Sequence, residues 1–132
     1  MQLQITPARL TSEIQAEFNA AFPFLKIEFA PDSQQEADKE HRSDRIGDIQ
    51  LKQTGGTMEI TGEMKVNEMR NKFRDQFSLL VQVYRRSGKM WLRTTLTEGW
   101  SLKKQNEYGK ELTLATAAEP ADAYREIPPT VQ

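Results

Sequence analysis

An internal repeat is the strongest constraint on how this chain can fold. Residues 2–29 and 57–84 of the 132-residue sequence carry the same order of apolar and polar side chains. Matched residues lie 55 positions apart throughout, and the apolar matches are Leu3 with Met58, Ile5 with Ile60, Ile14 with Met69, Phe18 with Phe73 and Phe22 with Phe77. Two patterned elements that recur at one constant offset predict a duplicated structural unit.

Each copy of the repeat predicts a strand, a helix and a second strand. Apolar residues alternate with polar ones over residues 2–6, which is typical of a half-buried strand. Apolar residues at helical spacing then predict a helix over residues 10–22, with Thr11 or Ser12 as its N-cap. Apolar and polar residues alternate again over residues 25–29, which predicts the second strand. The second copy predicts the corresponding elements, over residues 57–61, 66–77 and 79–85.

A glycine pair predicts a hairpin between the two copies. Gly55 and Gly56 lie between two alternating runs, 49–52 and 58–61, which is the pattern of a two-residue hairpin loop. This register sets Lys52 opposite Glu59 as a favourable cross-strand pair, and it sets Leu51 opposite Ile60 on the apolar face. Residues 49–52 would then form the last strand of the first copy.

These elements together predict an α+β fold. Two tandem βαββ repeats would form a mostly antiparallel sheet, or two abutting sheets, with both repeat helices packed on one face. We expect one domain over residues 1–116, made of repeats 1–53 and 56–96 and a C-terminal helix over 101–112. The helical pattern itself covers residues 101–108 of this segment, and Gly109 would be its stop signal.

Two segments are expected to lie outside the core. Residues 31–45 contain no large apolar side chain and predict a mobile loop, and residues 117–132 predict a flexible tail. The loop carries the only histidine, His41, beside Asp38, Glu40 and Asp44. A metal site needs ligands that are held still, and nothing in this segment would hold them. We therefore expect neither a metal nor a cofactor.

Composition and charge exclude several functional classes. The chain contains no cysteine, which excludes disulfides, thiolate chemistry and cysteine-based zinc sites. No apolar stretch reaches the ~18–20 residues that span a bilayer, and the N-terminus lacks the features of a signal peptide. We therefore expect a cytoplasmic protein without a membrane partner. The net charge is −1, but residues 57–116 carry 11 Lys/Arg against 7 Asp/Glu.

The predicted hairpin over residues 79–95 carries the strongest candidate for a binding site. With Ser87 and Gly88 as the turn, Tyr84 would face Trp91 and Arg86 would face Lys89. The candidate partner-binding residues on the outer face are Tyr84, Arg86, Lys89, Trp91 and Arg93. The opposite face, with Val81, Val83, Met90 and Leu92, would point into the core.

Three interpretations of this outer face remain open. Aromatic and basic side chains together are typical of protein-binding hot spots, and a protein partner is the leading hypothesis. The same side chains are what single-stranded nucleic acid requires for base stacking and phosphate contact. Alternatively, the C-terminal helix covers the face, and Tyr84 and Trp91 are a stabilising cross-strand pair.

No pattern of catalytic residues is present in the sequence. The single histidine lies in the predicted loop, and the carboxylate pairs, Glu13 with Glu17 and Glu36 with Glu40, are expected to be solvated. We therefore expect a binding or scaffolding module rather than an enzyme. An exposed sheet edge would allow either a monomer or a homodimer.

One region resembles a known family. The runs Val-Gln-Val-Tyr-Arg-Arg-Ser-Gly-Lys-Met-Trp-Leu-Arg (81–93) and Glu-Gly-Trp-Ser-Leu (98–102) are similar to a segment of a family of uncharacterised small bacterial proteins. The resemblance covers residues 57–112. It implies a self-standing bacterial domain and transfers no activity, cofactor or catalytic residue.

Overall fold

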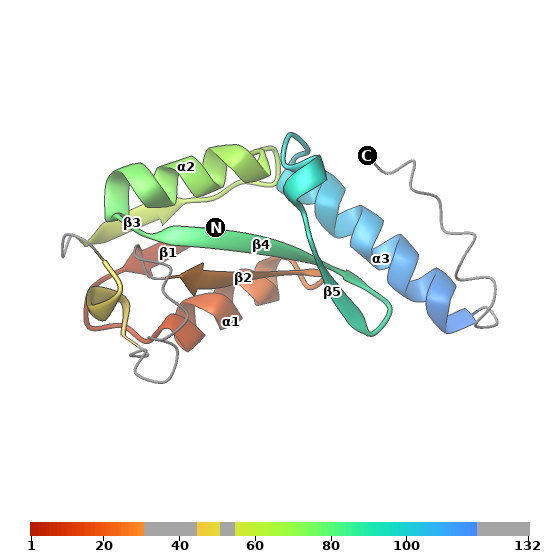
Figure 1. Ribbon diagram of the computed structural model, residues 1–132, viewed down its shortest axis with the longest axis horizontal. Helices are drawn as coiled ribbons and strands as arrows, with labels where there is room; N and C mark the ends of the chain where they lie inside the picture. The colour runs from red at the N-terminus through yellow and green to blue at the C-terminus, as the bar shows by residue number, and fades with distance from the viewer. Residues whose placement is uncertain (31–44, 51–54, 119–132) are drawn as a thin grey trace.

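The computed structural model describes residues 1–30, 45–50 and 55–118. Its α+β class confirms the prediction, since three α-helices accompany strands that all pair in antiparallel fashion (Figure 1). In chain order the elements are β1 (Gln2–Ile5), α1 (Thr11–Ala21), β2 (Leu25–Ala30), the 3-10 helix η2 (Ile46–Asp48), β3 (Gly56–Glu59), α2 (Val66–Phe77), β4 (Leu80–Ser87), β5 (Met90–Arg93), the 3-10 helix η3 (Thr95–Thr97) and α3 (Leu102–Ala118).

The strands of the two copies pair with each other. Strand β1 pairs with β3 in a two-stranded sheet, and β2 pairs with β4 in a three-stranded sheet of order β2-β4-β5. The βαβ units β1-α1-β2 and β3-α2-β4 therefore each contribute one strand to each sheet. In this arrangement β2 and β5 are the edge strands of the larger sheet.

The hairpin predicted around Gly55 and Gly56 is wrong where the structure describes it. Gly56, a predicted turn residue, is part of β3 and lies opposite Ile5, and Glu59 lies opposite Gln2, whose Nε2 donates to Glu59 Oε1 at 3.1 Å. Residues 49 and 50 form a turn and an irregular segment, and residues 51–54 lie outside the described residues. A Cβ on Gly55 would lie 3.2 Å from Ile5 O. The glycine therefore permits close approach to β1.

Both repeat helices begin with the same hydrogen bond. The Leu10 N–H donates to Glu13 Oε1 at 3.0 Å before α1, and the Lys65 N–H donates to Glu68 Oε1 at 2.9 Å before α2. The carboxylate satisfies a backbone donor that would otherwise have no partner at the helix start. The N-cap of α1 is therefore Leu10, and the predicted caps, Thr11 and Ser12, lie inside the helix.

Side chains from both copies form one hydrophobic core. The buried stripes of α1 and α2 centre on Phe18 and Phe73, which are fully buried. The ring of Phe29 on β2 meets the ring of Phe73 on α2 edge-on at 5.8 Å, so a strand of the first copy contacts the helix of the second. The core also contains Leu3, Ile5, Ile14, Leu25, Ile27, Ile46, Met58, Ile60, Val66, Met69, Leu79, Val83 and Leu102.

The C-terminal helix is longer than the sequence predicted. Helix α3 continues through Gly109 to Ala118, so Gly109 is not a stop signal. A Cβ at this position would lie 3.0 Å from Arg85 Cγ and 3.0 Å from Phe24 Cβ. The glycine is therefore required for close packing of α3 on β4. The start of the predicted tail, residues 117 and 118, is helical. The rest of the tail and residues 31–44 of the predicted loop lie outside the described residues.

Candidate binding face

The hairpin of β4 and β5 turns one residue later than predicted. The observed pairs are Tyr84 with Arg93, Arg86 with Trp91 and Ser87 with Met90, so Tyr84 does not face Trp91. Gly88 has a φ of +66°, which suits the first central position of a type II′ turn, and Lys89 is the second. Moving the turn by one residue shifts each partner by two positions, so every side chain stays on its predicted face.

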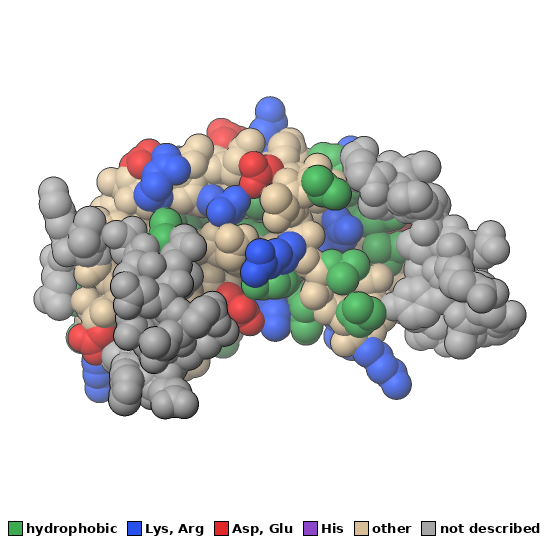
Figure 2. All heavy atoms as spheres, in the orientation of Figure 1, with side chains coloured by type: hydrophobic (Ala, Val, Ile, Leu, Met, Phe, Trp, Pro, Cys, Tyr) green, Lys and Arg blue, Asp and Glu red, His purple; other side chains and the backbone are tan. Residues whose placement is uncertain are grey.

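The structure brings four of the five predicted site residues onto one face. We call the surface formed by Lys26, Tyr84, Arg86, Trp91 and Arg93 the outer face. Tyr84 and Trp91 are half-buried, whereas Arg86 and Arg93 are exposed. The fifth predicted residue, Lys89, is exposed in the turn at the end of the hairpin. Figure 2 shows basic side chains over β2 and β4 and hydrophobic ones over β5.

Lys26 is the residue that sequence reasoning missed. It lies on β2 directly opposite Tyr84. Its Nζ is 5.5 Å from the ring centroid of Tyr84 and 5.0 Å from that of Trp91, and it is 3.3 Å from Glu28 Oε2. The alternation over residues 25–29 already indicated that Lys26 points away from the core. Nothing in the sequence indicated that β2 would be the neighbour of β4.

Helix α3 packs on the opposite side of the sheet. It contacts Arg85, whose Nη1 donates to Gln105 Oε1 at 2.8 Å and whose guanidinium lies 4.9 Å from the ring centroid of Tyr108. Arg85 and its neighbour Tyr84 point to opposite faces, because side chains alternate along a strand. The alternative in which the C-terminal helix covers Tyr84 and Trp91 is therefore wrong.

Two residues predicted for the core are largely exposed. Met90 and Leu92 share the inward face with Val81 and Val83, but their exposed fractions are 55% and 37%. Strand β5 is an edge strand and pairs only with the last part of β4, from Tyr84 onward. The helices that bury Val81 and Val83 on β4 cover β5 less completely.

A groove extends the outer face around the edge of β2. Its volume is about 380 Å³. Helix α1 contributes Gln15 and Asn19 to its wall, and Lys26, Glu28 and Trp91 form the side next to the outer face. Gln15 Nε2 donates to Ile27 O at 2.9 Å, and Asn19 Nδ2 donates to Leu25 O at 2.8 Å. These amides occupy carbonyls that an edge strand would otherwise present to solvent.

A buried cation lies beneath the sheet on the α3 side. Arg85 is 5% exposed, and no carboxylate within the described ranges pairs with it. Burial lowers the pKa of its guanidinium, and the interaction with Tyr108 partly opposes this effect. The faces of Trp100 and Tyr108 lie 5.9 and 4.9 Å from the guanidinium. Trp100 itself is half-buried.

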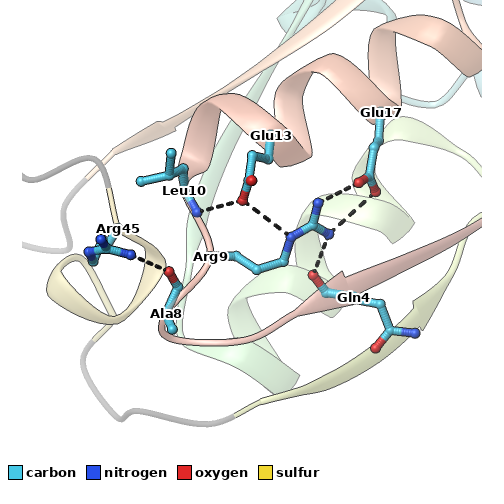
Figure 3. Close-up of polar contacts among 7 residues, drawn as sticks. All are labelled: Gln4, Ala8, Arg9, Leu10, Glu13, Glu17 and Arg45. Carbon is cyan, nitrogen blue, oxygen red and sulfur yellow. Dashed lines mark hydrogen bonds and ion pairs between the residues drawn. The ribbon is translucent and has the colours of Figure 1, made fainter.

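An ion-pair network links β1 to the start of α1 (Figure 3). Arg9 pairs with Glu13 and Glu17 and donates to Gln4 O at 3.1 Å. The hydrogen bond from Arg9 lowers the pKa of Glu17, and its charge adds to this effect. All the charged groups in the network are paired, and the network holds a strand against a helix. It is therefore a structural feature and does not add to the binding face.

The described residues show neither a metal cluster nor a membrane helix. No group of three or more His, Asp or Glu side chains in residues 1–30, 45–50 and 55–118 could hold a metal ion, and His41 lies outside these ranges. No helix among them is long and apolar enough to cross a membrane.

Comparisons with known proteins found no relative of the chain. No protein-family model, no curated protein and no solved structure matches it. The resemblance of residues 57–112 to a bacterial family therefore stays a prediction.

Proposed function

We propose that this chain is a non-catalytic binding module that contacts a protein partner through the outer face. One observation carries the proposal: antiparallel pairing of β2, β4 and β5 places two aromatic rings and three cations side by side. Trp, Tyr and Arg are the side chains most enriched at binding hot spots. On the composition and the bacterial resemblance, we propose a cytoplasmic location in a bacterium.

The charge of the outer face indicates an acidic partner. Among the described residues, Lys26, Arg86 and Arg93, with Lys89 at the hairpin end, outnumber the carboxylate of Glu28, which pairs with Lys26. Positive and negative surfaces attract before contact and suppress wrong partners. Half-buried Tyr84 and Trp91 would form the apolar centre of the contact, surrounded by charged groups at its rim.

The position of Lys26 favours protein over nucleic acid. Its Nζ lies over the rings of both Tyr84 and Trp91, so a base that stacks on either ring from this side would have to displace Lys26. Base stacking needs a free ring face. Single-stranded nucleic acid is the second candidate, because the cations could contact phosphates if Lys26 moved away. Its affinity would fall steeply with salt, because phosphate contacts release counterions.

Comparative affinity capture tests the proposal. The wild-type chain, Trp91→Ala and Arg93→Glu would be used as baits in parallel, with Lys72→Glu as a control that reverses an exposed charge on α2. We expect a protein that the wild type and the control both retain and that both outer-face variants lose. A partner set that is identical for all four baits would refute the proposal. Saturable binding of a labelled single-stranded oligonucleotide at ~50 mM salt, lost in the same two variants, would support the second candidate.

A further inference from the structure

The duplication produces two equivalent grooves. One lies between α1 and β2 and contains Gln15 and Asn19; the other lies between α2 and β4 and contains Arg70 and Arg74, each 55 residues further on. In the first groove, Gln15 Nε2 donates to Ile27 O at 2.9 Å. In the second, Arg70 Nε donates at 2.8 Å to Val81 O, a carbonyl of β4 that lies 54 residues after Ile27. We call the second groove the arginine groove.

The first groove shows what the fold requires at these positions. An amide is sufficient to satisfy the strand carbonyl, as Gln15 demonstrates, and Asn19 satisfies a second carbonyl, Leu25 O. Arg74, at the position equivalent to Asn19, makes no hydrogen bond to a main-chain carbonyl in the described part of the chain. Its Nε contacts Asp75 Oδ1 at 3.0 Å instead. The two arginines therefore carry more donors than the structural role uses.

The surplus donors converge on the arginine groove, which has a volume of about 260 Å³. Asn67, Arg70, Asn71 and Arg74 line it from α2, at the spacing of one helix face. Arg70 is held in place because it also donates to Glu98 Oε2 at 2.8 Å. The side-chain amides of both asparagines and the Nη atoms of Arg74 have no hydrogen-bond partner among residues 1–30, 45–50 and 55–118.

The charge of the arginine groove favours an anion. Glu98 neutralises Arg70, which leaves the charge of Arg74. The pair of Arg74 with Asp75 is weak, because the two side chains are 57% and 64% exposed and water screens their attraction. A guanidinium offers a planar pair of donors that matches the two oxygens of a carboxylate or a phosphate.

We propose that the arginine groove is a binding site for an oxyanion, the phosphate or carboxylate group of a small molecule. The free Nη atoms of Arg74 bind two of its oxygens, and the amides of Asn67 and Asn71 donate from the same helix face. The site involves none of the residues of the outer face, so the proposal stands independently of the proposed function.

Titration followed by NMR tests this site. Inorganic phosphate and, separately, succinate would be added to the ¹⁵N-labelled chain, with chloride keeping the ionic strength constant. We expect saturable shifts, with a millimolar dissociation constant, at the Arg70 and Arg74 Nε–H groups and at the two asparagine amides. A stronger response to phosphate would identify a phosphate ester as the ligand class, and a stronger response to succinate would identify a carboxylate.

The first groove supplies the matched variant. Arg70→Gln with Arg74→Asn gives the arginine groove the side chains of its counterpart and keeps a donor for Val81 O, so the fold is retained. We expect this variant to bind the anion at least tenfold more weakly, whereas Lys72→Gln, which removes an exposed charge elsewhere on α2, changes the affinity less than twofold. The absence of saturable shifts with either anion, or equal affinity in the double variant, would overturn the proposal.

Discussion

At the scale of single residues, Arg85 is the most unusual side chain. A buried cation without a carboxylate depends on neutral acceptors, and here Gln105 Oε1 is the nearest at 2.8 Å. The same Gln105 donates through Nε2 to Thr97 O at 2.7 Å. Removing an acceptor from a buried charge costs more free energy than removing the charge together with its acceptor.

We therefore predict that Gln105→Leu destabilises the fold by about 2–4 kcal/mol, because it leaves the Arg85 guanidinium buried and poorly solvated. Adding Arg85→Met should restore at least about 1 kcal/mol, because no buried charge remains and the stem of the side chain still packs. Urea denaturation of the two variants measures both values. A double variant less stable than Gln105→Leu alone would contradict this account of the site.

The ion pair of Arg9 with Glu17 predicts a dependence of stability on pH. The pKa of Glu17 is lower in the folded state, chiefly through the hydrogen bond from Arg9. The stabilisation is therefore fully present at a pH above the ordinary pKa of glutamate, and it is lost as the pH falls through the lowered pKa of the folded state. The Glu17 side chain is 43% exposed, so we expect at most about 1 kcal/mol.

The variant Glu17→Gln isolates this contribution. It should be slightly less stable than the wild type at neutral pH, and the difference should shrink at acidic pH, as the pH falls through the lowered folded-state pKa of Glu17. Urea midpoints at the two pH values provide the comparison. A difference that persists unchanged at the lower pH would show that the charge of Glu17 is not the cause.

At the scale of elements, Gly109 determines how closely α3 approaches the sheet. Glycine inside a helix costs about 1 kcal/mol relative to alanine, so helix propensity alone would favour Gly109→Ala. The new Cβ, however, would lie 3.0 Å from Phe24 Cβ and 3.2 Å from Phe24 O, and backbone cannot move aside as a flexible side chain does. Overpacking of this kind typically costs about 1–3 kcal/mol.

We expect the steric cost to exceed the gain in propensity, so that Gly109→Ala lowers the melting temperature. Gly99→Ala, in a turn, is a control for the added methyl group, because apart from its chain neighbours no heavy atom of the described residues lies within 4 Å of a Cβ at that position. Thermal unfolding followed by circular dichroism compares the two variants. If Gly109→Ala were the more stable variant, α3 would not pack as closely on Phe24 as the structure shows.

The same elements show what a local pattern can and cannot predict. Periodicity located α1, α2 and most strands to within a few residues, and it assigned Tyr84, Arg86, Trp91 and Arg93 to one face. It could not choose between partners for β3, because residues 49–52 and β1 have the same alternation. Gly109 was misread because a helix stop and a close contact both require glycine, and only the neighbouring element distinguishes them.

At the scale of the whole molecule, neither the outer face nor the arginine groove could be predicted from one segment of the sequence alone. Lys26 completes the outer face only because β2 pairs with β4 across the two copies. Likewise, the surplus of donors on Arg70 and Arg74 is visible only when the second groove is compared with the first. The repeat indicated the units, whereas their pairing with each other came from the structure.

This pairing predicts that the two copies unfold together. Both strands of the first copy, β1 and β2, pair with strands of the second copy, and Phe29 of the first copy contacts Phe73 of the second. Phe18→Ala removes a fully buried ring from α1 and should cost about 3–5 kcal/mol. Because both sheets and the hydrophobic core combine residues of the two copies, this loss should appear equally in α2, which the substitution does not alter.

Native-state hydrogen exchange measures the effect in each helix separately. The slowest amides of α1 and α2 should report the same free energy of opening in the wild type, and Phe18→Ala should lower both values by the same amount, because their exchange requires global unfolding. The mirror variant Phe73→Ala should give the same pattern. If the amides of α2 kept their protection against exchange in Phe18→Ala, the two copies would unfold as separate cooperative units.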